Sequence, residues 1–146
     1  GREAVGAMTV FSGGEPDKNE YRKFKIKIGQ GQANDIRMLK EILERRFNNN
    51  WPLPDLIVVD GGKAQLNAAS QILKKYQLEI PDVAVAKGAG LRSAIAPDKL
   101  FFPGQAKPLE LPLASPALHL IKRVRDEAHR FAIGYHRRLR SRARFV

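Results

Sequence analysis

Residues 56–63 read Leu56-Ile57-Val58-Val59-Asp60-Gly61-Gly62-Lys63. The four apolar residues, three of them β-branched, predict a strand buried on both faces, as parallel strands of α/β proteins are. Asp60 then stands at the carboxyl end of this strand, before a glycine turn into a helix, where open α/β sheets place their active sites. A strand-end Asp also suits a helix N-cap or a turn. The buried strand, the two glycines and the basic chain favour a chemical role for Asp60.

The chain is strongly basic and contains no cysteine. Its 146 residues suit one domain with a core. Lys and Arg number 26 against 15 Asp and Glu, a formal charge of +11. A domain this basic usually binds a polyanion, with nucleic acid as the first candidate and a membrane surface as the rival. No apolar run approaches the length that spans a bilayer. The lack of cysteine excludes disulfides, thiolate nucleophiles and Cys-based zinc sites.

The N-terminal half predicts a hairpin and a helix. Residues 4–11 and 21–28 flank a turn-rich stretch, and the second segment alternates Lys with Phe or Ile, the period of a half-exposed strand. We therefore expect an antiparallel hairpin with a basic outer face. The segment from about Asn34 to Phe47 predicts a helix with Asn34 as its N-cap. Its apolar stripe consists of Ile36, Leu39, Ile42, Leu43 and Phe47.

The C-terminal half predicts a pair of parallel strands and a long helix. A helix from about Lys63 to Tyr76 follows the strand at 56–60 and leads to a second apolar strand at 83–86, which implies a right-handed crossover. Residues 88–112 predict a loop or a small hairpin, and Ser115-Pro116 opens a long helix. The apolar stripe expected on that helix is Ala117, Leu120, Ile121, Val124, Ala128, Phe131 and Tyr135. The fold class is α/β, with a mixed sheet, antiparallel then parallel, flanked by helices.

Two histidines lie on the predicted final helix. His129 and His136 share a stripe with Lys122 and Arg125, away from the expected apolar stripe. A single His on a helix is more often a surface or structural residue than a ligand. If His129 approaches Asp60, the pair could bind a divalent cation, or divide the work between metal binding and proton transfer.

The C-terminal residues are rich in arginine. Nine of the 25 residues from Lys122 to Val146 are Lys or Arg, and the helical ones, with Arg130 and Lys63, could line a phosphate-binding face. Residues 137–146 predict a basic tail or linker that is solvated and frayed. A nucleotide-binding loop at 61–63 is not supported, because the spaced upstream glycine and the Ser or Thr after the lysine are missing.

Four stretches of the chain resemble one protein family. They are Asp55–Leu66 (DLIVVDGGKAQL), Leu100–Gly104 (LFFPG), Ser115–His119 (SPALH) and Arg125–Ala132 (RDEAHRFA). Together they resemble the C-terminal endonuclease domain of UvrC, the subunit of the bacterial nucleotide-excision-repair excinuclease that cuts damaged DNA. The segment from Glu15 to Arg22 is also similar to an early hairpin of that domain, so the resemblance covers essentially the whole chain.

The resemblance implies a single RNase H-like endonuclease domain over residues 1–146. Its activity would be metal-dependent hydrolysis of a phosphodiester in double-stranded damaged DNA, 5′ to the lesion. Asp60 and His129 match the family's catalytic residues, as ligands of Mg²⁺ or Mn²⁺ or, for His129, as a proton-transfer group. Asp35 matches a further catalytic acid, although its place at a helix start equally suits capping. The basic residues predicted to contact DNA are Lys63, Lys122, Arg125, Arg130, Arg137 and Arg138.

The resemblance also implies parts that lie outside this chain. In the family a second catalytic Asp stands in a Phe-Asp-Ile-Ser segment, just upstream of the residues matching 1–3. That segment is the central strand of RNase H-like sheets, so we expect the chain alone to be inactive and to leave strand edges unpaired. The helicase-like UvrB subunit would bind through regions outside this chain. The setting would be DNA repair in the bacterial cytoplasm, within the SOS response, and away from membranes.

Two other functions stay open. The chain alone could be a DNA-binding module without activity, because one catalytic carboxylate is expected to be missing. It could instead be a basic interaction domain that docks onto acidic protein surfaces. A steep loss of affinity for duplex DNA with rising salt favours phosphate contacts, whereas a flat response favours a protein partner.

Overall fold

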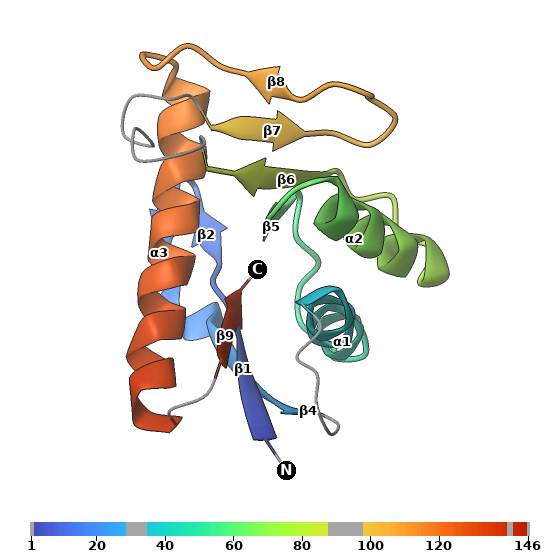
Figure 1. The fold of residues 1–146 in the computed structure, drawn as a ribbon, viewed down its shortest axis with the longest axis vertical. Coiled ribbons are helices and arrows are strands. Elements are labelled where there is room, and N and C mark those ends of the chain that lie inside the picture. The colour runs from blue at the N-terminus through green and yellow to red at the C-terminus, as the bar shows by residue number, and fades with distance from the viewer. Residues whose placement is uncertain (1, 29–34, 88–97, 140–141, 146) are drawn as a thin grey trace. The chain divides into compact units, whose positions relative to one another are not determined.

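The computed structural model describes residues 2–28, 35–87, 98–139 and 142–145, with side chains described for 5–26, 35–87 and 98–134. The chain forms two compact units, of which the first comprises Gly1–Trp51 and Asp126–Val146 and the second comprises Pro52–Arg125. The long helix α3 (Pro116–Leu139) contributes residues to both units. Figure 1 shows the helices and strands and labels most of them.

The first unit is built on an antiparallel hairpin. Besides part of α3, its elements are β1 (Arg2–Met8), β2 (Phe11–Ser12), β3 (Glu15–Pro16), the 3₁₀ turn η1 (Lys18–Glu20), β4 (Arg22–Ile28), α1 (Asp35–Phe47) and β9 (Arg142–Phe145). β1 and β4 pair antiparallel over their whole length, from Arg2 opposite Ile28 to Met8 opposite Arg22. Phe24 and Ile26 are buried, whereas Lys23 and Lys25 are exposed. The predicted hairpin with a basic outer face is therefore confirmed.

Helix α1 packs closely against this hairpin. Its Met38 and Ile42 join Met8, Phe24 and Ile26 in one hydrophobic cluster. A Cβ added at Gly6 of β1 would lie 2.5 Å from Ile42 Cδ1, so a glycine is what allows the helix to approach the strand. Leu39, Ile42 and Leu43 are buried as the sequence predicted, but Met38 and Arg46 are buried as well. The predicted N-cap, Asn34, lies outside the described residues.

Two arginines stack on Trp51, the last residue of the stretch Gly1–Trp51 of this unit. The guanidinium carbon of Arg22 lies 4.8 Å from the ring centroid and that of Arg46 lies 5.6 Å from it. Burial lowers the pKa of Arg46 from its ordinary value. Because the delocalised guanidinium is weakly hydrated and stacks on aromatic faces, Arg can occupy the buried position 46, where Lys would be costly.

The predicted frayed tail is wrong for Arg142–Phe145, which form β9. This strand pairs parallel with β1, from Ala4 opposite Arg142 to Ala7 opposite Phe145, and gives the sheet the order β4-β1-β9. Without it, β1 would present a row of unpaired N–H and C=O groups, which is unfavourable for a strand. The composition of the last residues predicted a basic segment, but it did not predict that this segment would pair with β1 as a strand.

The second unit is built on a four-stranded sheet with the order β5-β6-β7-β8. Besides part of α3, its elements are β5 (Ile57–Asp60), α2 (Lys63–Lys75), β6 (Asp82–Ala86), β7 (Lys99–Phe101) and β8 (Leu109–Glu110). β5 and β6 are parallel, and the β7–β8 hairpin continues the sheet antiparallel. The predicted strand, crossover helix and parallel strand are confirmed, and the segment 98–112 contains the small hairpin.

The two faces of the second sheet have different neighbours. On one face, Ser70 of α2 donates a hydrogen bond to Asp82 at 2.7 Å, and α2 buries Leu66, Ala69, Ile72 and Leu73, as predicted. The other face carries a cluster of Val83, Val85 and Leu100, against which Val58, Phe102, Leu111 and Ile121 pack. Because Ile121 belongs to α3, the start of α3 covers this second face.

The buried stripe of α3 is shifted from the predicted one. Ser115 caps the helix as expected, with its Oγ 3.4 Å from the Leu118 N–H. Leu118, Ala128 and Ala132 are fully buried, whereas the predicted core residue Leu120 is 41% exposed. The buried residues include a charged one, Arg125, whose side chain is 10% exposed. Of the fully buried residues only Ala128 was predicted, and the sequence pattern placed Arg125 on the polar face.

The class α/β is confirmed, with parallel and antiparallel strand pairs and helices packed on the sheets. The strands of the described residues are divided between separate sheets rather than joined in one. No helix in the described part of the chain combines the length and the apolar character that crossing a membrane requires.

Candidate functional site

Asp60 is the last residue of β5 and lies beside Val85 of the parallel strand β6. The Gly61 N–H donates a hydrogen bond to the Val85 carbonyl at 2.9 Å, so the backbone stays attached to the sheet beyond Asp60. Gly61 has φ +132°, and a Cβ there would lie 2.5 Å from the Gln65 side chain. Only glycine accepts this backbone conformation without strain. The turn therefore fixes the backbone of Asp60 at the carboxyl edge of the sheet.

The start of α2 completes this turn. Its N-cap is Gly62, whose N–H donates to Gln65 Oε1 at 2.9 Å. The Gly62 carbonyl accepts the Leu66 N–H at 3.0 Å, which begins the helical hydrogen bonds. Since Gly62 holds the capping position, the reading of Asp60 as the N-cap of this helix is wrong. Asp60 is half-buried at the strand end, and Lys63 is exposed in the first turn of α2.

His129 lies on the part of α3 that belongs to the first unit, and its side chain is exposed. Its exposure agrees with the prediction that His129 lies off the buried core, but His129 follows Arg125 by one turn and so flanks the shifted stripe of α3. Asp60 belongs to the second unit. The expectation that His129 approaches Asp60 therefore stays a prediction.

A bound metal ion needs several donor side chains close together. Among them, no group of three or more His, Asp or Glu side chains lies close enough together to hold one. Asp60 offers a carboxylate, which suits Mg²⁺ and Mn²⁺, and His129 offers an imidazole nitrogen, which Mn²⁺ accepts more readily. The chemistry of both donors fits such a metal.

Tyr21, Glu127 and Arg130 form a polar cluster, in which Glu127 stands two residues before His129 on α3. The Tyr21 hydroxyl donates to Glu127 Oε2 at 2.7 Å, and Arg130 donates from Nε and Nη2 to the two carboxylate oxygens at 2.7 and 2.8 Å. The Tyr21 ring meets Phe131 edge-on at 5.0 Å between centroids. The spacing of Glu127 and Arg130 is a helical pair visible in the sequence, but Tyr21 is 106 residues away from Glu127.

The cluster changes the acidity of its members. The hydrogen bonds from Arg130, followed by that from Tyr21, outweigh the effect of burial and lower the pKa of Glu127 from 4.5 to about 2. Burial, and then the bond to Glu127, raise the pKa of the Tyr21 phenol above its usual range. Arg130 was predicted to contact DNA. Its side chain is 62% exposed, and its guanidinium is bound to Glu127 on one edge.

Acid is expected to weaken the first unit through Glu127. Its folded pKa of about 2 lies below the ordinary 4.5, so its contribution to the free energy of unfolding is complete above pH 4.5 and is lost as the pH falls through 2. Urea unfolding between pH 2 and pH 7 measures this loss, which Glu127→Gln should reduce and the exposed control Glu79→Gln should leave unchanged. Identical acid dependence in the wild type and Glu127→Gln would contradict the assignment.

Arg125, another predicted DNA contact, is engaged inside the second unit. Its Nη1 donates to Asp98 Oδ2 at 2.7 Å, and the two side chains are 10% and 2% exposed. Asp98 stands immediately before β7, and the sequence analysis did not single it out. A buried carboxylate needs a partner of opposite charge, so we assign Arg125 a structural role and leave it out of the surface that could meet DNA.

The remaining predicted residues are placed as follows. Asp35 is the exposed first residue of α1, a position that favours a negative charge at a helix start. Lys122 is half-buried on α3. His136, Arg137 and Arg138 lie in α3, but their side chains are outside the described part of the chain.

Comparison with known families gives a match along most of the chain. Residues 1–133 match the model of the UvrC RNase H endonuclease domain. The chain belongs to this family. The resemblance seen in the sequence motifs is thereby confirmed, together with the α/β class expected of an RNase H-like domain.

Curated relatives of this UvrC-family chain agree with the match. UvrABC system protein C of Dictyoglomus thermophilum is 44% identical over 144 residues, covering 97% of this chain and 23% of the relative. The protein of the same name from Chlorobium phaeobacteroides is 44% identical over 145 residues, covering 97% and 22%. That of Trichlorobacter lovleyi is 44% identical over 154 residues, covering 97% and 25%. The chain thus spans about a quarter of the length of these relatives.

Proposed function

We propose that this chain is the domain that cuts DNA in a UvrABC-type excision repair system. It would hydrolyse a phosphodiester of double-stranded damaged DNA, 5′ to the lesion. The observation that carries the proposal is the Asp60 carboxylate, held at the carboxyl edge of a parallel strand pair by the Gly61-Gly62 turn. Family membership supports the class of reaction, since the matching family is an endonuclease domain.

The proposed reaction depends on Mg²⁺ or Mn²⁺. When bound, such an ion supplies a nucleophile by activating water and neutralises charge that builds up on the phosphate. Asp60 would hold the ion through a carboxylate oxygen. His129 would act as a second ligand or would move a proton, and Asp35 would act as a further acid. Because the described residues contain no group of three ligands, further ligands would have to come from elsewhere in the assembled protein or from the DNA.

Metal removal tests this proposal. The intact protein that carries this domain, assembled with its repair partners on a duplex with one defined lesion, is expected to stop cutting 5′ to the lesion in excess EDTA. Added Mg²⁺ or Mn²⁺ should restore the cut, while retention of the DNA in a gel-shift assay should survive chelation. Undiminished cutting in EDTA, with the product ends mapped at nucleotide resolution, would refute metal-dependent hydrolysis.

A DNA-binding module without activity of its own is the second candidate function. The formal charge of +11 favours contact with phosphates whether or not the strand is cut. The affinity for undamaged duplex DNA is then expected to fall steeply between low and physiological salt, and the full-length protein should not make the 5′ cut with any metal. A flat salt dependence would point instead to a basic domain that docks onto acidic protein surfaces.

The proposed setting follows from the names of the relatives. Proteins called UvrABC system protein C belong by that name to a system with several components, and we place this chain in the same system. UvrB would be the partner that presents the damaged DNA, bound through regions outside residues 1–146. We propose the bacterial cytoplasm as the location, because the substrate is chromosomal DNA.

A further inference from the structure

Lys87 follows β6 directly, at the same edge of the second sheet as Asp60. β6 ends at Ala86, and the parallel register places Asp60 of β5 opposite Val85 of β6. Lys87 is therefore two residues beyond the partner of Asp60. With neighbouring strands about 4.8 Å apart and about 3.3 Å of rise per residue, an extended Lys87 has its Cα roughly 8 Å from that of Asp60.

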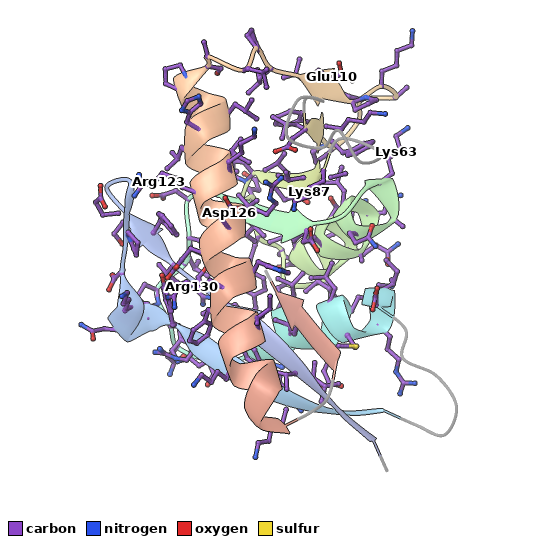
Figure 2. The ribbon with its side chains drawn as sticks, turned by 60° about the vertical axis from the view of Figure 1, so that its left-hand side comes forward. Lys63, Lys87, Glu110, Arg123, Asp126 and Arg130 are labelled. Atoms are coloured by element: carbon purple, nitrogen blue, oxygen red, sulfur yellow. The ribbon has the colours of Figure 1, made fainter. Side chains whose placement is uncertain are left out.

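The two side chains also belong to the same face of the sheet. Val58 packs against Val83 and Val85 in one cluster, which places these side chains on the face covered by the start of α3. Side chains two residues apart along a strand share a face. Asp60 follows Val58 by two residues and Lys87 follows Val85 by two, so the carboxylate and the exposed ammonium emerge side by side at one edge. Figure 2 labels Lys87 and also Lys63 of α2.

The simplest structural explanation of Lys87 is that it neutralises the buried Asp98. Continuing the β6–β7 register by one residue beyond Ala86 and Lys99 would bring Lys87 opposite Asp98. Asp98, however, already has a partner, because Arg125 binds it at 2.7 Å. Lys87 is therefore not needed to neutralise the buried Asp98 carboxylate.

We infer that Lys87 binds a non-bridging phosphate oxygen of the DNA strand held at Asp60. The inference rests on the proposed function and adds a substrate-binding residue to the same site. A lysine ammonium is a compact charge with three donors and no acceptor, so it binds phosphate oxygens and does not compete for a metal ion. Beside a carboxylate that repels the DNA backbone, one fixed cation stabilises the approach of the phosphate and the negative charge that grows on it in the transition state.

The test compares Lys87→Gln with Lys74→Gln in the intact protein. Lys74 is also exposed and carries the same charge, but it lies in the last turn of α2, whose C-terminus is at the opposite edge of the parallel strands. Single-turnover cutting of pre-bound damaged duplex is expected to slow by about 10-fold to 100-fold in Lys87→Gln. The slope of log affinity against log salt should become shallower by about 1. Lys87→Arg should restore most of both losses, and Lys74→Gln should retain the wild-type rate.

Outcomes for Lys87 and for the proposed function can be separated. If Lys87→Gln matches Lys74→Gln in cutting rate and salt slope, while Asp60→Asn cuts poorly, the Lys87 contact is overturned and the nuclease assignment stands. If Asp60→Asn cuts like the wild type, the proposed function fails, and the salt slope alone decides whether Lys87 touches phosphate. Far-UV circular dichroism of each variant verifies that the substitution leaves the fold intact, as is expected at the exposed positions 87 and 74.

Discussion

Replacing Asp60 with Asn is expected to slow the 5′ cut by at least about 1,000-fold, because an amide is a far weaker ligand for a hard divalent cation than a carboxylate. The change keeps the size of the side chain, and Asp60 is only half-buried at the end of β5. DNA binding should therefore be retained. The rate of 5′ product formation under single-turnover conditions is the measurement, with the intact protein and its partners.

A matched control is available on the same strand. Asp55 is exposed and stands just before β5, at its amino end. Asp55→Asn removes the same charge from the opposite edge of the sheet and should cut normally. If Asp60→Asn also cuts at the wild-type rate, Asp60 is not a metal ligand and the function proposed for this chain fails.

His129→Ala in the same assay tests whether the histidine serves the same step. We expect a loss of about 100-fold or more, in the range of a general acid or base. Residues that act as one unit are strongly non-additive, so Asp60→Asn combined with His129→Ala should cut no more slowly than the slower single variant. His119→Ala, at another exposed histidine of α3, is the control. Multiplicative losses in the double variant would argue that the two residues act independently.

Arg125→Met is expected to lower the free energy of unfolding by about 3–5 kcal/mol, because it leaves the Asp98 carboxylate buried without its ion-pair partner. Asp98 is 2% exposed and the bond between the two side chains is 2.7 Å. Methionine keeps much of the length of the arginine side chain, so packing is largely preserved. Urea unfolding followed by far-UV circular dichroism measures the change.

Two further variants isolate the ion pair. Arg123→Met, at an exposed position two residues earlier on the same helix, should change stability by less than about 0.5 kcal/mol. Adding Asp98→Asn to Arg125→Met removes the unpaired charge and should recover part of the loss. If Arg125→Met behaves like Arg123→Met, the ion pair contributes little and Arg125 is again a candidate for contact with DNA.

Much of the fold could be predicted from the sequence because the signals are local. The alternation of lysine with Phe24 and Ile26 gave the hairpin, and the apolar run before Asp60 gave the parallel strand pair. The two glycines after Asp60 are also explained locally. Gly61 adopts φ +132°, which favours glycine, and Gly62 is the N-cap of α2. The position of Asp60 at the carboxyl edge of the sheet follows from these elements.

The rest depended on contacts between residues far apart along the chain. Asp98 and Arg125 are 27 residues apart in the sequence. Arg125 was expected to contact DNA, but it forms a buried ion pair with Asp98. Tyr21 reaches Glu127 across 106 residues. β9 pairs with β1 at the other end of the chain. Periodicity and composition report which face of an element is apolar, but they do not report which partner satisfies a buried charge or a free strand edge.

Trp51 is the chain's single tryptophan, and its ring packs beside Phe24 and beneath two guanidinium groups. It belongs to the first unit, while the second unit contains no indole. Intrinsic fluorescence is therefore an optical probe of one unit, whereas far-UV ellipticity records helices and strands of both. A shift in the ellipticity midpoint without a matching shift in emission would reveal that the two halves melt separately, and Arg125→Met is the variant that should make this difference visible.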